Sequence, residues 1–242
     1  MKKDTLHPAM VLHNSASAKG SVLFYILIAV ILFAALNYAV SQIMRSGNAD
    51  TVGAQQASLY ADEILDYAEK IRVAVQHIRI TNGCDAADIS FENTSVAGYV
   101  HAPVVSDSCK VFSSSGGGLR YIPPLTAYGT GTEWIFGGRL SFVGLGTDCG
   151  AGESCSELYM VLSGLDLAVC EALNTKLGLS TPSGNPPQQN DAVGFTKFVG
   201  DYTWEEDLDD DTHDDVLSGK PAGCSETSGG GSYFFYTALV VR

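Results

Sequence analysis

The chain has 242 residues, of which 45% are hydrophobic, so it can bury a sizeable core and extensive disorder is disfavoured. Fourteen Lys and Arg residues oppose 27 Asp and Glu residues, which gives a formal net charge of −13. Binding along a nucleic-acid backbone requires clustered basic side chains, so this balance argues against nucleic acid as the main partner.

Residues 21–40 form an uncharged, mostly apolar run with the sequence SVLFYILIAVILFAALNYAV. As an α-helix, a run of this length extends about 30 Å, which matches the hydrocarbon core of a bilayer. Secretory signals have a shorter apolar region, of about 7–15 residues, before a small-x-small cleavage site. The sequence therefore predicts a transmembrane helix over residues 21–45.

The charges on either side of this run predict its orientation. Lys2, Lys3 and Lys19 precede the run, whereas Arg45 is the one basic residue that follows closely. Cytoplasmic flanks of membrane spans carry the excess of Lys and Arg. We therefore expect residues 1–20 in the cytoplasm and the acidic remainder of the chain on the other side of the membrane.

All six cysteines follow the apolar run. Their spacing differs from the closely spaced pairs of a zinc site, and an even number on one side of a membrane is typical of disulfides in an oxidising compartment. Pairing of sequence neighbours is the simplest arrangement, although the sequence does not choose among the alternatives. The neighbour pairs are Cys84–Cys109, Cys149–Cys155 and Cys170–Cys224.

The N-terminal segment 1–20 is polar and basic, with the sequence MKKDTLHPAMVLHNSASAKG, and it ends in Lys19-Gly20 directly before the apolar run. This arrangement resembles the prepilin signal of type IV pilins and pseudopilins. The resemblance implies that a prepilin peptidase cleaves between Gly20 and Ser21 on the cytoplasmic side and methylates the new N-terminus. It also implies an inner-membrane protein with a periplasmic or extracellular C-terminal domain, which assembles with other pilin-like subunits into a filament.

One residue departs from the family pattern. Major subunits of this family carry glutamate at the fifth mature position, where this chain has Tyr25. That acid is thought to pair with the N-terminal amine of a neighbouring subunit, and its absence resembles certain minor subunits at a filament tip. The alternative interpretation is an uncleaved single-span anchor in which Lys19-Gly20 has no special role.

Residues 46–83 are expected to form a linker and an amphipathic helix. Two glycines and an asparagine within 46–53 interrupt or loosen the first helix. A second helical pattern runs over residues 55–80 and ends at Asn82-Gly83. Its apolar stripe consists of Leu59, Ile64, Ala68, Ile71, Val75 and Ile78.

Residues 84–242 read as a single exported head rich in turns. The pattern predicts a helix over residues 166–177, closed by Gly178. Short runs rich in Val, Ile, Tyr and Phe predict strands at 97–105, 120–122, 133–136, 139–143, 158–162 and 232–241. The expected fold class is α+β, in which one long N-terminal hydrophobic and amphipathic helix packs on an antiparallel sheet, as the resemblance to pilins implies.

An acidic cluster is the one candidate metal site. Asp207, Asp209 and Asp211 alternate, which can turn several carboxylates toward one calcium ion. The pattern is not that of an EF-hand loop, because Thr212 and Ser218 occupy the positions of the required Gly and Glu. A solvated acidic loop is the alternative, although some pilin-like subunits of secretion systems hold calcium in such a loop. Calcium aside, nothing in the sequence predicts a cofactor.

The sequence nominates no catalytic residue. The run Ser113–Gly118 lacks the lysine of a phosphate-binding loop, no G-x-S-x-G motif occurs, and the five histidines are scattered. We therefore expect a structural protein, not an enzyme: a minor pilin or pseudopilin-like subunit of a type IV pilus or type II secretion-type filament. The second interpretation is an uncleaved, single-span periplasmic binding or scaffold protein, and a membrane-anchored hydrolase is third.

Overall fold

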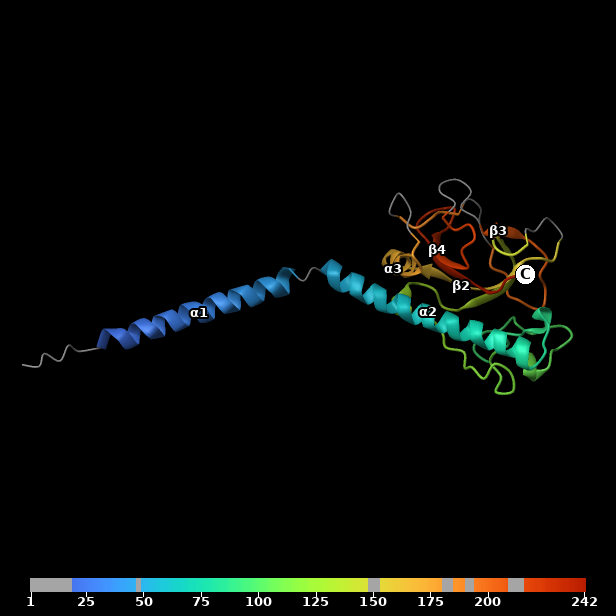
Figure 1. The fold of residues 1–242 in the computed structure, drawn as a ribbon, viewed down its shortest axis with the longest axis horizontal. Helices are drawn as coiled ribbons and strands as arrows, with labels where there is room; N and C mark the ends of the chain where they lie inside the picture. The colour runs from blue at the N-terminus through green and yellow to red at the C-terminus, as the bar shows by residue number, and fades with distance from the viewer. Residues whose placement is uncertain (1–18, 47–48, 148–152, 180–184, 190–193, 209–215) are drawn as a thin grey trace, which may run out of the picture. The chain divides into compact units, whose positions relative to one another are not determined.

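A computed structural model describes residues 19–46, 49–147, 153–179, 185–189, 194–208 and 216–242. The chain divides into two compact units, Met1–Ala49 and Asp50–Arg242. The first unit contains helix α1, Lys19–Ser46. The second contains helix α2, Ala49–Thr81, with all but its first residue, helix α3, Leu167–Leu177, and the whole sheet (Figure 1).

Helix α1 has no apolar face distinct from a polar one. From Phe24 to Tyr38, where its side chains are described, every residue is exposed and none is charged. Within the described residues, however, no helix combines the length and the hydropathy that a membrane crossing requires.

Helix α2 buries one face over almost its whole length. The buried residues recur every three or four positions, as an amphipathic helix requires. They are Ala57, Ala61, Ile64, Tyr67, Ala68, Ile71, Ala74, Val75 and Ile78. Leu59, which was expected on this face, is instead 62% exposed. The helix ends at Thr81, and Gly83 follows with a φ of 65°, so the predicted stop at Asn82-Gly83 is confirmed.

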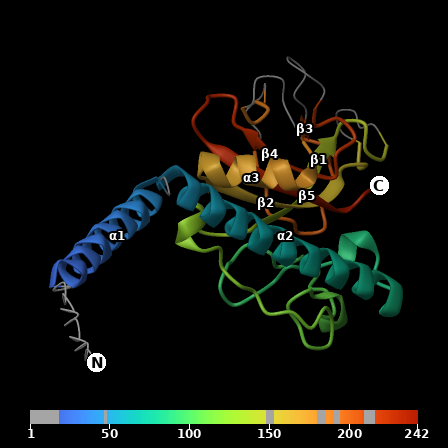
Figure 2. The same cartoon turned by 60° about the vertical axis from the view of Figure 1, so that its left-hand side comes forward.

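The sheet has five strands in the order β3-β1-β2-β5-β4 (Figure 2). Neighbouring strands run antiparallel except for β3, which runs parallel to β1. The strands are β1 (Ile135–Phe142), β2 (Glu157–Leu165), β3 (Glu206–Leu208), β4 (Ala222–Glu226) and β5 (Tyr233–Val240).

Both faces of the sheet are buried, because alternate residues of each central strand enter different cores. On one face, Met160 and Phe235 join the apolar residues of α2 and α3. On the other face, Tyr159 and Tyr236 join a smaller core that is closed by residues from loops, including Leu179 and Leu217. Burial on both faces explains why β2 and β5 are nearly continuous hydrophobic runs.

The expected pilin-like fold class is wrong. The sheet is mixed, not antiparallel, because Leu140–Phe142 of β1 pair in parallel with β3. The N-terminal region is also not one long helix packed on the sheet, since α1 and α2 are separate helices and fall in different units. Strand β3 escaped prediction because it is three residues long and begins Glu-Asp, which are poor strand formers.

Two further strand predictions are wrong, at 97–105 and 120–122, where the structure has irregular backbone. Side-chain hydroxyls bind the backbone here in place of a strand ladder. The hydroxyl of Tyr99 donates to the carbonyl of Trp134 and accepts from the N–H of Phe136, both at 3.1 Å. The hydroxyl of Tyr121 accepts from the N–H of Trp134, also at 3.1 Å. In both stretches a buried tyrosine is followed by an exposed aliphatic residue, and this alternation resembles the pattern of a strand.

Candidate functional site

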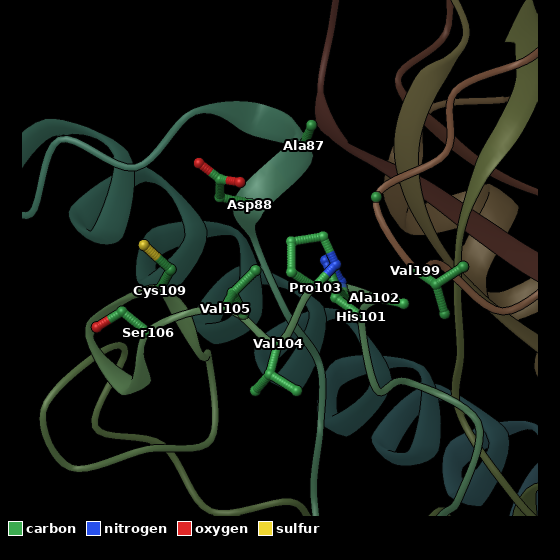
Figure 3. A pocket seen from close by; sticks show the side chains of 11 residues that line it. Ala87, Asp88, His101, Ala102, Pro103, Val104, Val105, Ser106, Cys109 and Val199 are labelled. Atoms are coloured by element: carbon green, nitrogen blue, oxygen red, sulfur yellow. The ribbon is translucent and has the colours of Figure 1, made fainter.

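A cavity of about 400 Å³ lies beside the segment that follows α2 (Figure 3). Its walls come from three stretches of chain, at 87–88, 101–109 and 199–200. In Figure 3 the side chains of His101 and Pro103 lie between Asp88 and Val199. Among the residues of the wall are Asp88, His101, Val104, Val105, Val199 and Gly200.

A disulfide and a short bridge fix the first two stretches. Cys84, just after α2, is bonded to Cys109, with their Cα atoms 5.8 Å apart. Ser90 and Lys110 pair as an isolated parallel bridge, in which the N–H of Val111 donates to the carbonyl of Ser90. One wall is therefore held by covalent and backbone bonds, and does not depend on the packing of exposed side chains.

His101 is the most buried polar side chain of the cavity wall, with 5% of its surface exposed. Its ring meets Phe198 edge to face at 5.6 Å. Nε2 is buried, and no described residue forms a hydrogen bond with it. Burial lowers the pKa of His101, an effect that the nearby carboxylates of Asp88 and Glu92 oppose. The imidazole is therefore neutral at neutral pH and offers one nitrogen lone pair.

Gly200 allows the third stretch to approach the other two. Its φ of 92° disfavours any other residue, and a Cβ built there would lie 3.0 Å from the carbonyl oxygen of Ala87 and 3.3 Å from Nδ1 of His101. Next to it Val199 is 43% exposed, and across the cavity Val104 is 68% exposed. Two valine side chains thus lie at the rim, while the interior carries a histidine.

Asp88 is the one acidic side chain of the cavity wall, and no Lys or Arg lies in that wall. Its side chain is in an exposed position, and no described residue forms an ion pair or a hydrogen bond with its carboxylate. Cys109 and Ser106 are the two wall residues whose side chains could serve as nucleophiles, and neither is activated. Cys109 is in a disulfide, and the Ser106 hydroxyl accepts hydrogen bonds from Ser108 and donates to no described base. The arrangement suits binding of a small molecule more than covalent chemistry.

The predicted disulfides are largely found. Cys84–Cys109 and Cys170–Cys224 are bonded as sequence neighbours, and the second links α3 to β4. Cys155 is also disulfide-bonded, and no described cysteine is free. Cys149 lies outside the described residues.

The other predicted sites are described only in part. Gly20 and Ser21 lie in the first turn of α1. Of the candidate calcium ligands, Asp207 lies in β3, where its carboxylate accepts a hydrogen bond of 2.8 Å from Nε1 of Trp204. Asp209 and Asp211 lie outside the described residues, and the described part of the chain contains no cluster of metal-ligating side chains.

The buried carboxyl group at the start of β2 was not predicted. Glu157 is fully buried; its Oε2 accepts from the N–H of Phe142 at 2.9 Å, whereas Oε1 has no hydrogen-bond partner among the described residues. Burial raises the pKa of Glu157 to about 7. Glutamate at a strand end is ordinarily solvated, so only the fold reveals this one.

His101 and Asp88 were also not predicted as a site. They are 13 positions apart in the chain, and no short motif connects them. Comparison with protein-family models, with curated proteins and with solved structures finds no match.

Proposed function

We propose that this chain is a membrane-anchored structural subunit of the minor pilin or pseudopilin kind. In this proposal a prepilin peptidase cuts between Gly20 and Ser21, and the apolar helix that follows first anchors the chain in the inner membrane. The helix then packs against other pilin-like subunits in a filament, and the disulfide-bonded unit is carried outside the cytoplasm.

The observation that carries this proposal is the junction at Lys19-Gly20. A basic, polar leader ends there, and the uncharged segment 21–40 begins at the next residue. From Phe24 to Tyr38 the apolar side chains of α1 are exposed all around the helix. Exposed apolar surface of this extent requires lipid or protein to cover it.

The disulfides support the exported location. Bonds such as Cys84–Cys109 and Cys170–Cys224 persist in oxidising compartments, and both lie after the apolar segment. The excess of basic residues before that segment gives the same orientation.

A processing experiment tests this function. We expect Gly20→Val to leave the full-length chain in the membrane and to remove it from the sheared filament fraction of the native host. The matched control, Ala16→Val, places the same side chain within the leader and should be processed normally. Equal processing of both variants, or no wild-type chain among sheared filaments, would contradict the proposal.

The second candidate function is an uncleaved, single-span binding or scaffold protein. The cavity beside His101 favours it, because a pocket with an apolar rim and a few polar groups is typical of small-molecule sites. This alternative predicts that residues 1–20 remain on the mature chain and that the chain is absent from filaments.

A further inference from the structure

The cavity beside His101 has a charge pattern that selects among ligands. No Lys or Arg lies in its wall, so nothing there can neutralise an anion. Asp88 supplies one carboxylate, in a chain whose formal net charge is −13. An anionic ligand would therefore meet uncompensated repulsion, whereas a cation would gain a partner.

Lys110, which follows Cys109 of the cavity wall in the sequence, already forms ion pairs with other residues. Nζ of Lys110 lies 3.0 Å from a carboxylate oxygen of Glu92 and 2.8 Å from one of Asp107. Both acids hold it by hydrogen bonds, which raise its pKa. Lys110 is thus committed to two other carboxylates, and the carboxylate of Asp88 has no ion-pair partner among the described residues.

The rest of the wall suits an aliphatic body. Val104 and Val199 are substantially exposed at the rim, and Val105 and Pro103 continue the apolar surface. Filling this surface with a few methylene groups removes apolar area from water, which favours binding. A cavity of about 400 Å³ accommodates such a chain with room for its polar head.

His101 adds no positive charge to the cavity wall. Its lowered pKa keeps the imidazole uncharged at neutral pH, so the ring does not repel a cation. The neutral ring has one lone pair that can accept a hydrogen bond. An ammonium group has three N–H donors, which a carboxylate such as that of Asp88 can accept.

We propose that this cavity binds a small alkylammonium compound, with its ammonium group at Asp88 and its aliphatic chain against Val104, Val105 and Val199. The binding is independent of whether the chain enters a filament. It would give the exported unit a means to recognise amines in its surroundings.

The test uses three ligands with the same aliphatic chain and different heads: n-butylammonium, n-butanol and butyrate. The full-length chain is placed in nanodiscs of zwitterionic lipid, which do not attract the amine, and ring resonances of histidine are followed by NMR. His77 lies on the exposed side of α2, away from the cavity wall, and serves as an internal control. We expect butylammonium to shift His101 and not His77.

Butylammonium should bind about fivefold more tightly than butanol, as an accessible ion pair allows. Butyrate should bind more weakly than butanol. Asp88→Asn should make the affinities for butylammonium and butanol equal, whereas Glu171→Gln, which removes an exposed acid on α3, should preserve the preference. Butanol binding as tightly as butylammonium to the wild type, or an unchanged preference in Asp88→Asn, would overturn the proposal.

A second measurement tests the proposal on the wild-type chain, so it does not depend on the folding of a variant. In the wild-type chain, raising the NaCl concentration should weaken butylammonium binding, because salt screens the attraction to Asp88, and should leave butanol binding unchanged. An identical salt response for the two ligands would overturn the proposal without any substitution.

Discussion

The side-chain amide of Asn174 forms two hydrogen bonds with the backbone of Cys224. Its Nδ2 donates to the Cys224 carbonyl and its Oδ1 accepts from the Cys224 N–H, both at 2.8 Å. Cys224 lies in β4, an edge strand of the sheet, and Asn174 lies in α3. The amide therefore supplies the strand-like partner that an edge residue lacks, beside the Cys170–Cys224 disulfide.

Replacing this amide should destabilise the unit Asp50–Arg242. Asn174→Leu removes two buried hydrogen bonds and leaves an N–H and a C=O without partners, at a cost of about 2–4 kcal/mol. The free energy of unfolding from denaturant titration measures this loss. Thr175→Ala is the matched control on the same helix, because the Thr175 hydroxyl binds only the Glu171 carbonyl at an exposed site. Equal stability of both variants would contradict this role for Asn174.

The pairing of β1 with β2 requires a glycine. Gly137 lies opposite Tyr159, and a Cβ on Gly137 would overlap the Tyr159 ring. Gly137→Ala should cost about 1–3 kcal/mol through overpacking, measured by thermal or denaturant unfolding. Gly194→Ala, where a Cβ meets no atom within 4 Å, should be nearly neutral. In the Tyr159→Val background, Gly137→Ala should cost less; an equal cost there would refute the clash.

The burial of Glu157 makes stability depend on pH. Its pKa rises from 4.5 to about 7 in the folded chain, so the folded state holds a proton that the unfolded state has lost between these values. Stability from this group is therefore present at pH 4.5 and falls as the pH rises through 7, by about 3 kcal/mol in all. Unfolding titrations at pH 5 and pH 8 measure this change.

Glu157→Gln should remove most of that dependence. The wild type must be compared with this variant because His101 changes the stability in the opposite direction. The lowered pKa of His101 makes stability fall as the pH decreases below about 6.5. Both chains contain His101, so its contribution cancels in the difference between them. If the wild type and Glu157→Gln show the same change in stability from pH 5 to pH 8, Glu157 does not titrate as described.

The Cys170–Cys224 disulfide closes a loop with a sequence separation of 54 residues. In the chain-entropy account, removing a bond of this span costs about 4 kcal/mol. The paired variant Cys170→Ser with Cys224→Ser should therefore unfold at a lower denaturant concentration than the wild type. Peptide mapping without reductant should recover the 170–224 and 84–109 cross-links, and recovery of any other pairing of these four cysteines would contradict the structure.

Elements with a strong local signal were predicted well. The periodicity of α2, the Asn82-Gly83 stop, helix α3 with Gly178 and the aromatic run of β5 follow from the residues themselves. Strand β4, with the sequence AGCSE, lacks β-branched residues and is stabilised by Asn174 and by the Cys170–Cys224 bond, which only the folded chain brings together.

The candidate site lay beyond local reasoning for a similar reason. Gly200 and His101 are 99 positions apart and meet because Gly200 has no side chain. The stretch at 97–105 has the pattern of a strand because the buried Tyr99 and His101 alternate with the exposed Val100 and Ala102. Its hydrogen bonds to Trp134 and Phe136 are made by the Tyr99 hydroxyl, which no alternation pattern reveals.

Mass spectrometry of the N-terminus of the chain purified from its native membrane tests the proposed function most directly. The proposal predicts a mature chain that begins at Ser21 and carries one methyl group on its amine. A chain that retains residues 1–20 would contradict it and would favour the uncleaved anchor.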